Sequence, residues 1–267
     1  MKLGFIGRND LEGVELDAKF AAEHGFSGLE YNYWDDFRNL EESTVREMRA
    51  ILDKYGIGVS ALGLWGWNHL APEPAVREEA HTMLDRAIHF AQILGAEVLI
   101  AGGGDIPGAS LEEQVKEFVK FFPPFLERAT QAGLAVSMYA VHGNSFFTSI
   151  EAYERVWEHF PEIRIKFDPA NWKLHGDDYL AIVRDHGDKI GHVHIKEILC
   201  MDGELVSQPA AGMGDIEWGK IMAFLYEYGY EGYLSMEPHG PLWSREPLRE
   251  KMLLLSQRYI SQFLLGH

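Results

Sequence analysis

Three side chains that can bind a divalent cation stand at the ends of three strand-like segments in the C-terminal half of the chain. Asp168 closes "IRIKFD", His194 lies in "GHVHIKE", and Glu237 lies in "GYLSMEPHG". Two carboxylates and one imidazole form an oxygen-rich ligand set that suits Mn²⁺, Mg²⁺, Co²⁺ or Fe²⁺, and Zn²⁺ is also compatible. A lone buried histidine is more often a core residue than a ligand, so the hypothesis rests on all three residues occurring in register.

Alternation of polar and apolar residues predicts which side chains share one face of a strand. In segment 163–170 the apolar residues occupy every second position, so Lys166 and Asp168 share the other face. In segment 134–143 the same procedure directs Met138, Ala140 and His142 inward. The inward polar residues predicted on the other segments are Glu30, Asn32, His192, His194, Lys196, Ser235, Glu237 and His239. Because buried charges cost several kcal/mol unless they pair or bind a cation, this interior indicates a functional centre, with a network of ion pairs as the alternative.

Eight β-rich segments alternate with amphipathic helical segments, and this order predicts the fold. They span residues 2–7, 27–33, 56–64, 96–104, 134–143, 163–170, 189–197 and 232–240. Strands that are each followed by a helix pair in parallel, and eight such units form a closed (β/α)8 TIM barrel of the α/β class. No linker or low-complexity tract interrupts the pattern, so we expect a single domain over residues 1–267. Catalytic groups of such barrels lie at the carboxyl ends of the strands, where Asp168, His194 and Glu237 fall.

Composition excludes several classes of partner. The formal net charge is -17, from 41 acidic and 24 basic residues, which disfavours nucleic acid and anionic membranes. No window approaches the roughly 18 apolar residues of a membrane span. The single cysteine, Cys200, rules out an internal disulfide, and the N-terminal residues do not resemble a signal peptide, so we expect a cytoplasmic location.

Four motifs carry a resemblance to a known family. The segments "FDPANW", "GHVHIKE", "AAGMGDIEW" and "GYLSMEPHG" resemble the strand-six to strand-eight motifs of the xylose-isomerase-like TIM barrel superfamily, the sugar phosphate isomerase/epimerase family, and the likeness covers nearly the whole chain. It implies a metal-dependent isomerase or epimerase with Mn²⁺ as the expected cofactor and a small-molecule carbohydrate as substrate. A homo-oligomer is compatible with it. The implied metal ligands are Glu, Asp, His and Glu from strands five to eight, and the last three correspond to Asp168, His194 and Glu237.

The first of those four ligands departs from the family pattern. The family has Glu-x-His-Gly, whereas this chain has Ala140, Val141, His142 and Gly143. The resemblance therefore places a methyl group where a metal ligand and acid/base residue is expected, which implies an impaired site. Either the chain is an engineered, inactivated variant, or the natural protein has changed its chemistry. The residues around Ala140 keep the family pattern, which favours the engineered substitution.

Aromatic and polar residues after the strands indicate the substrate class. Tryptophans follow strands two, three, six and eight, and aromatic rings are good platforms for the apolar face of a sugar. Arg8 and Lys173 are the only obvious basic residues for a phosphate, so an unphosphorylated sugar, keto-sugar or cyclitol is favoured. The residues predicted to bind substrate are Glu30, Trp34, Trp65, Trp67, His69, Asn171, Trp172 and His239.

The predicted mechanism is proton abstraction beside a carbonyl. A cation at the three ligands would acidify the carbon-bound proton. Glu237, or the carboxylate missing at position 140, would remove it to form an enediolate, with Lys196 and His142 beside the charged oxygen. A dehydratase or lyase acting on a keto-sugar, glycoside or cyclitol would share this intermediate. The sequence also leaves open a non-catalytic sugar-binding barrel and a DNA-repair nuclease, and the acidic net charge argues against the nuclease.

Overall fold

The β-rich segments form a closed barrel in the computed structural model, which describes residues 1–265. Within that range eight parallel strands pair in the order β1-β10-β7-β6-β5-β4-β3-β2. This confirms the predicted α/β TIM barrel. The strands are β1 (Lys2–Ile6), β2 (Gly28–Tyr33), β3 (Gly58–Leu64), β4 (Ala96–Ala101), β5 (Ala135–Tyr139), β6 (Arg164–Phe167), β7 (Ile190–Ile195) and β10 (Tyr233–Met236).

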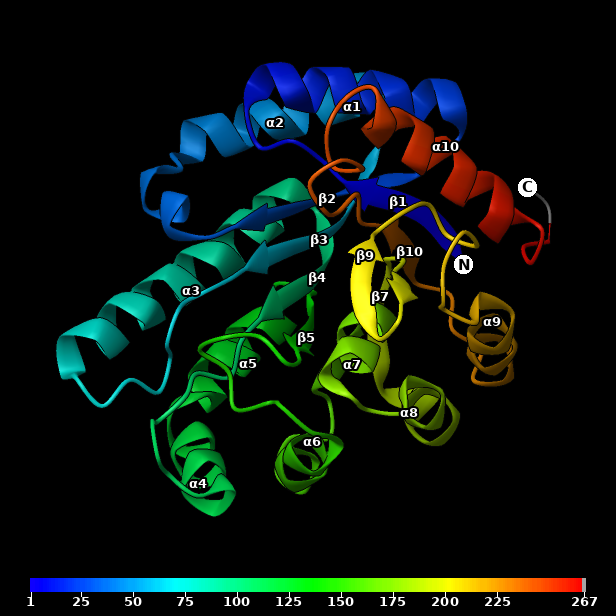
Figure 1. Cartoon of the computed structure of the whole chain (residues 1–267). Helices are drawn as coiled ribbons and strands as arrows, with labels where there is room; N and C mark the ends of the chain where they lie inside the picture. The colour runs from blue at the N-terminus through cyan, green and yellow to red at the C-terminus, as the bar shows by residue number, and fades with distance from the viewer. Residues whose placement is uncertain (266–267) are drawn as a thin grey trace.

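Helices surround the strands as an outer ring (Figure 1). Glycines in the left-handed conformation end the first three, at Gly25, Gly56 and Gly95. The segment between β4 and β5 contains two helices, α4 and α5, because Pro123 begins a new one. The helices are α1 (Leu11–His24), α2 (Glu42–Tyr55), α3 (Pro74–Leu94), α4 (Leu111–Phe121), α5 (Pro123–Gln131), α6 (Ile150–Trp157), α7 (Pro169–His175), α8 (Tyr179–His186), α9 (Trp218–Glu227) and α10 (Leu248–Ser261), with short 3-10 turns η1 (Asp35–Asn39) and η2 (Gly187–Lys189).

The apolar core lies between the strands and the helix ring. Leu99 of β4 and Met138 of β5, for example, pack in this layer with Phe122 and Leu126. Burying such side chains stabilises the fold by roughly 25 cal/mol per Å² of apolar surface. The barrel interior holds polar groups beside a small apolar cluster. Among the described residues, no helix combines the length and apolarity that crossing a membrane requires.

A hairpin that the sequence pattern does not predict follows β7. Strands β8 (Leu199–Met201) and β9 (Glu204–Ser207) pair antiparallel beside the barrel. The buried carboxylate of Glu197 anchors the chain around it. Its Oε1 accepts hydrogen bonds from the amides of Ile198 and Ile216, both 3.0 Å, and its Oε2 accepts from the amide of Gly212 and the indole of Trp218, at 3.1 and 3.0 Å.

We expect Glu197→Ala to lower the free energy of unfolding by about 3 kcal/mol or more, because each buried N–H that loses its acceptor costs about 1–3 kcal/mol. Denaturant titration followed by circular dichroism measures the change. Glu204→Ala, at an exposed position of the hairpin, is the control and should stay within about 0.5 kcal/mol of the parent. Equal stability of the two variants would contradict the anchoring role.

Candidate functional site

A buried carboxylate, Glu30 of β2, organises the centre of the barrel. It accepts hydrogen bonds from Asn32 Nδ2 at 2.8 Å and Ser235 Oγ at 2.6 Å. Its two oxygens also lie 2.8 Å from Nε2 of His192 and Nε2 of His194. Burial by itself would raise the pKa of Glu30, but the two histidines outweigh burial and hold the pKa well below its usual range. Glu30 therefore stays ionised and braces the histidines instead of facing the cavity.

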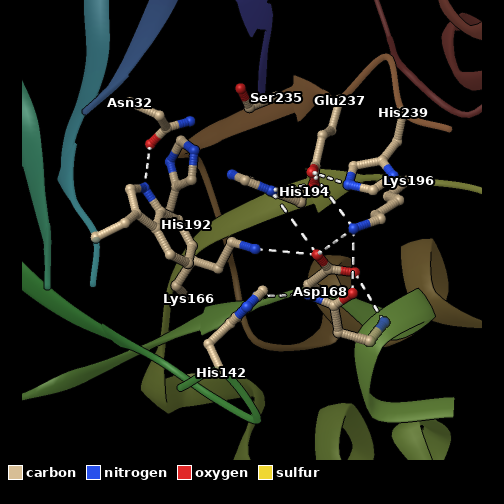
Figure 2. Close-up of polar contacts among 12 residues, drawn as sticks. Asn32, His142, Lys166, Asp168, His192, His194, Lys196, Ser235, Glu237 and His239 are labelled. Carbon is tan, nitrogen blue, oxygen red and sulfur yellow. Dashed lines mark hydrogen bonds and ion pairs between the residues drawn. The ribbon is translucent and has the colours of Figure 1, made fainter. Parts of the chain in front are cut away.

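Asp168, His194 and Glu237 lie together in the barrel interior (Figure 2). Asp168 and Glu237 directly follow β6 and β10, and His194 lies within β7. His194 Nδ1 is 2.8 Å from Glu237 Oε2 and 3.9 Å from Asp168 Oδ2. One donor atom from each residue falls within 4.8 Å of the others.

This donor set fits a divalent cation. The bond of His194 Nε2 to Glu30 leaves Nδ1 as the ring nitrogen that faces Asp168 and Glu237. A carboxylate on the second nitrogen of a metal-binding histidine is the usual way to fix its orientation. The structure therefore contains a cluster that could hold a metal.

Two lysines pair with the carboxylates of Asp168 and Glu237. Lys166 Nζ donates to Asp168 Oδ2 at 3.0 Å. Lys196 Nζ donates to Asn171 Oδ1 at 3.1 Å and to Glu237 Oε1 at 3.4 Å, and it is 4.0 Å from Asp168 Oδ2. Asp168 Oδ1 accepts from the backbone amide of Asn171 and so caps α7. Asp168 is thus held by an ammonium on one oxygen and a helix start on the other.

The charges around Glu237 determine its protonation. Burial would raise the pKa of Glu237, but Lys196 and His194 outweigh burial and hold the pKa well below its usual range. Burial would likewise lower the pKa of His194, but Glu30 and Glu237 keep it raised. For Lys196, the attraction of Glu237 and Asp168 overcomes burial and raises the pKa. The cluster therefore contains an ionised carboxylate, Glu237, beside a protonated ammonium, Lys196.

A cavity of about 380 Å³ opens at the carboxyl ends of the strands. Its walls include His142, Lys166, His194, Lys196, Glu237 and His239. A larger groove, about 590 Å³, runs between α4 and α6 on the outer ring, away from these residues. We assign the candidate site to the smaller cavity because the charged groups meet there.

Two neutral imidazoles line the cavity. His142 is joined through Nε2 to Asn171 Nδ2 at 2.9 Å, and burial and nearby Lys166 lower its pKa to about 4. His239 lies 3.7 Å from Glu237 and bonds Gln208 at 3.0 Å, and burial lowers its pKa. In Figure 2, His142 and Glu237 approach the Lys166–Asp168 pair from opposite sides.

Aromatic rings form one wall of the cavity. Trp65 stacks on Tyr139 with ring centroids 4.3 Å apart and on Trp34 with centroids 5.8 Å apart. Its indole nitrogen donates to Asn32 Oδ1 at 2.7 Å. Trp65 is 5% exposed, whereas Trp34 is 54% exposed. Trp34 is therefore the ring with a surface open to a ligand.

Of the predicted substrate residues, Trp34, Trp65 and His239 line the cavity, and Asn171 contacts its lining residues His142 and Lys196. Trp67, His69 and Trp172, like Glu30, do not line it. Trp172 is 1% exposed and packs in the outer core. Trp67 lies beneath the Arg38 guanidinium, 4.4 Å from ring centroid to carbon. His69 is fully buried with its ring edge against Phe122, and burial lowers its pKa to about 3. Large residues following a strand can pack the loop itself, and spacing alone does not separate that role from ligand binding.

Strand β5 has the opposite phase to the one predicted. Met138 faces the helix layer, and Tyr139 belongs to the interior cluster with Ala61 and Ile100. Ala140 is buried with the main apolar core. The inward residue at the end of β5 is therefore Tyr139, and the expectation that Met138 points inward is wrong. The correspondence of position 140 to a metal ligand stays a prediction.

The backbone after β5 explains this error. Val141 adopts a φ of 53°, a left-handed conformation, and breaks the alternation between Tyr139 and His142. His142 then reaches the cavity although the strand phase has changed. Polar Ser137, which points inward beside β6, was the signal in the sequence for the correct phase.

Lys166 and Tyr139 are the residues to which sequence reasoning gave no role. Alternation on β6 does place Lys166 inward, but its contact with Asp168 depends on side-chain geometry. Arg8, considered only for phosphate, also lines the cavity and pairs with Glu246 at 2.9 Å.

Comparisons with known proteins identify the family. A family model described as xylose isomerase-like TIM barrel matches residues 18–258, so the chain belongs to that family. A curated relative in Escherichia coli (strain K12) is named "Putative L-ribulose-5-phosphate 3-epimerase SgbU"; it is 23% identical, and the match covers 79% of this chain and 76% of the relative. The family relatives include sugar isomerases and epimerases.

Solved structures share the fold. D-psicose 3-epimerase with D-tagatose from Clostridium cellulolyticum H10 has a TM-score of 0.79 and 17% identity, with 99% of each chain covered. The IOLI protein with a binding zinc atom also has a TM-score of 0.79 and 17% identity, with 99% of this chain and 100% of the other covered. At these identities the likeness establishes the barrel alone.

We expect Ala140→Glu to destabilise the protein by about 3 kcal/mol without raising its affinity for Mn²⁺, because the new carboxylate would enter the apolar core unpaired. Thermal unfolding and Mn²⁺ titration measure the two effects. Ala135→Glu, at an exposed position of the same strand, is the matched control and should unfold like the parent. Tighter Mn²⁺ binding at unchanged stability would support position 140 as a ligand site.

Proposed function

We propose that the protein is a sugar isomerase or epimerase that removes a proton from the carbon beside a carbonyl of an unphosphorylated sugar or keto-sugar. The observation that carries the proposal is the ionised Glu237 in the cavity wall, 3.4 Å from the Lys196 ammonium. A carboxylate base next to a fixed cation suits enolisation, because negative charge moves from the base to the substrate oxygen as the proton leaves.

The side chains of this chain divide the steps among them. Glu237 takes the carbon-bound proton, and Lys196 stabilises the oxygen of the resulting enediolate. Return of that proton to the neighbouring carbon, with transfer of the hydroxyl proton to the former carbonyl oxygen, gives isomerisation. Epimerisation needs a proton from the other face. His142 lies on the side opposite Glu237 (Figure 2), and its neutral ring could orient a water molecule that supplies this proton. Asn171 aligns both partners, since it bonds His142 and Lys196 together.

A divalent cation is part of this proposal. Asp168, His194 and Glu237 would hold it, and the oxygen-rich donors favour Mn²⁺, with Mg²⁺, Co²⁺ and Zn²⁺ also compatible. A bound cation would supply Lewis acidity that polarises the carbonyl. Glu30 would orient the histidine ligand from below.

The pairing of the cavity's cations supports an unphosphorylated substrate. Lys166 is paired with Asp168, Lys196 with Glu237, and Arg8 with Glu246. A phosphate would have to break such a pair to be bound. Exposed Trp34 instead offers an apolar face to a sugar ring. A cytoplasmic location, expected from the sequence, belongs to the same proposal.

The test is a screen of ketoses and 3-keto-glycosides for exchange of a carbon-bound proton in D₂O, followed by NMR. Glu237→Gln should reduce exchange at least ~10²-fold, because the amide cannot accept the proton. Glu204→Gln, on the exposed hairpin, should leave the rate unchanged. Exchange that persists in Glu237→Gln would remove the assigned base, and release of water or another group would show elimination instead of isomerisation.

A second prediction concerns the sugar platform. Trp34→Ala should weaken binding of the turned-over sugar by about 1 kcal/mol, because one stacking surface is lost. Trp157→Ala, on the outer ring beyond the barrel interior, is the control for removing an indole. Calorimetry on both variants measures the effect, and unchanged affinity in Trp34→Ala would place the sugar elsewhere in the cavity.

A further inference from the structure

Lys166 lies in the barrel interior next to the proposed cation site. It is the inward residue of β6 and pairs in register with Tyr139 of β5. Its side chain is 2% exposed, and its Nζ is 3.0 Å from Asp168 Oδ2 and 5.3 Å from the ring centroid of Trp65. The ammonium is thus held between a carboxylate and an aromatic face, both of which stabilise a positive charge.

The oxygen that Lys166 holds is the one a metal ion would need. Asp168 Oδ1 accepts from the amide of Asn171 at the start of α7. Oδ2 is the oxygen that faces His194 Nδ1 at 3.9 Å. A divalent cation binds carboxylate oxygens at about 2.0–2.2 Å, so an ion on Oδ2 would sit beside the ammonium and be repelled by it.

The charges of the interior are balanced by protein groups. Asp168 and Glu237 pair with the ammonium groups of Lys166 and Lys196 at 3.0 and 3.4 Å. Glu30 accepts hydrogen bonds from Asn32 and Ser235 and lies 2.8 Å from ring nitrogens of His192 and His194. Tyr139, the inward residue of β5, adds no negative charge that would draw a further cation.

We propose that the Lys166 ammonium is a built-in competitor of the divalent cation: it occupies the cation's place on Asp168, so the free protein binds divalent metal weakly. Metal enters only when the ammonium leaves Oδ2. This rests on the proposed cation site at Asp168, His194 and Glu237, and it assigns to Lys166 the regulation of metal affinity at that site.

The test is Mn²⁺ binding by the full chain, measured by the loss of the free-ion EPR signal. Lys166→Met removes the charge and keeps the length of the side chain, and it should bind Mn²⁺ at least tenfold more tightly than the parent. Lys189→Met is the matched control, since Lys189 also lies 5.3 Å over a tryptophan ring but bonds a backbone carbonyl. Its Mn²⁺ affinity should stay within twofold of the parent.

Thermal unfolding gives a readout that does not depend on activity. Removing Lys166 takes away the nearer cation of Asp168 and leaves only Lys196, at 4.0 Å. Lys166→Met should therefore melt earlier than the parent in EDTA and recover with Mn²⁺, whereas Mn²⁺ should shift the melting temperature of the parent little. If Lys166→Met does not fold, Lys166→Gln is a second variant that keeps a polar group at the end of the side chain. It should also bind Mn²⁺ more tightly than the parent.

The outcomes separate this inference from the proposed function. If the parent already binds Mn²⁺ as tightly as both Lys166 variants, the competitor role is overturned and the cation site stands. If neither parent nor variants bind Mn²⁺, the competitor role is overturned and the cation leaves the proposed mechanism. Proton exchange by the parent in D₂O tests the proposed sugar chemistry separately from Mn²⁺ binding, because that exchange depends on Glu237.

Discussion

The pairing of ionised side chains inside the barrel is the constraint on which the rest of the site depends. An unpaired ion in such an interior costs several kcal/mol, so each buried charge must meet an opposite one with good geometry. Glu30 illustrates the result: four side chains from three strands donate to its two oxygens. Remove any of these partners and the remaining charges must rearrange.

This pairing also decides what chemistry the cavity can support. Lys196 and His194 keep Glu237 ionised, and burial keeps His142 neutral. A base and a stabilising cation are therefore in place before a substrate arrives, which is the arrangement that electrostatic catalysis requires. The same pairing limits what can enter, because the cavity's ammonium and guanidinium groups are already engaged.

Much of the arrangement could be predicted locally. The glycines that end α1 and α2 and the alternation on β2, β6, β7 and β10 each depend on a few neighbouring residues. They placed Glu30, Asp168, His194 and Glu237 together. The alternation failed on β5, where Met138 faces the helix layer and Val141 interrupts the regular backbone. The hairpin β8–β9 and the burial of Trp67, His69 and Trp172 were not predicted either. These residues follow the strands in segments that carry no periodic pattern.

The amino-acid sequence by itself determined that this chain forms eight β/α units and that carboxylates, imidazoles and lysines fill their common interior, because strand alternation is a local property with a period of two. The tertiary structure alone decided which charges meet. Lys166 bonds Asp168, and Glu30 bonds His192 and His194 across the barrel, because barrel closure sets how far each strand is displaced along its neighbours. No short stretch of sequence contains that displacement, so the partners of each buried charge emerge only when the last strand pairs with the first.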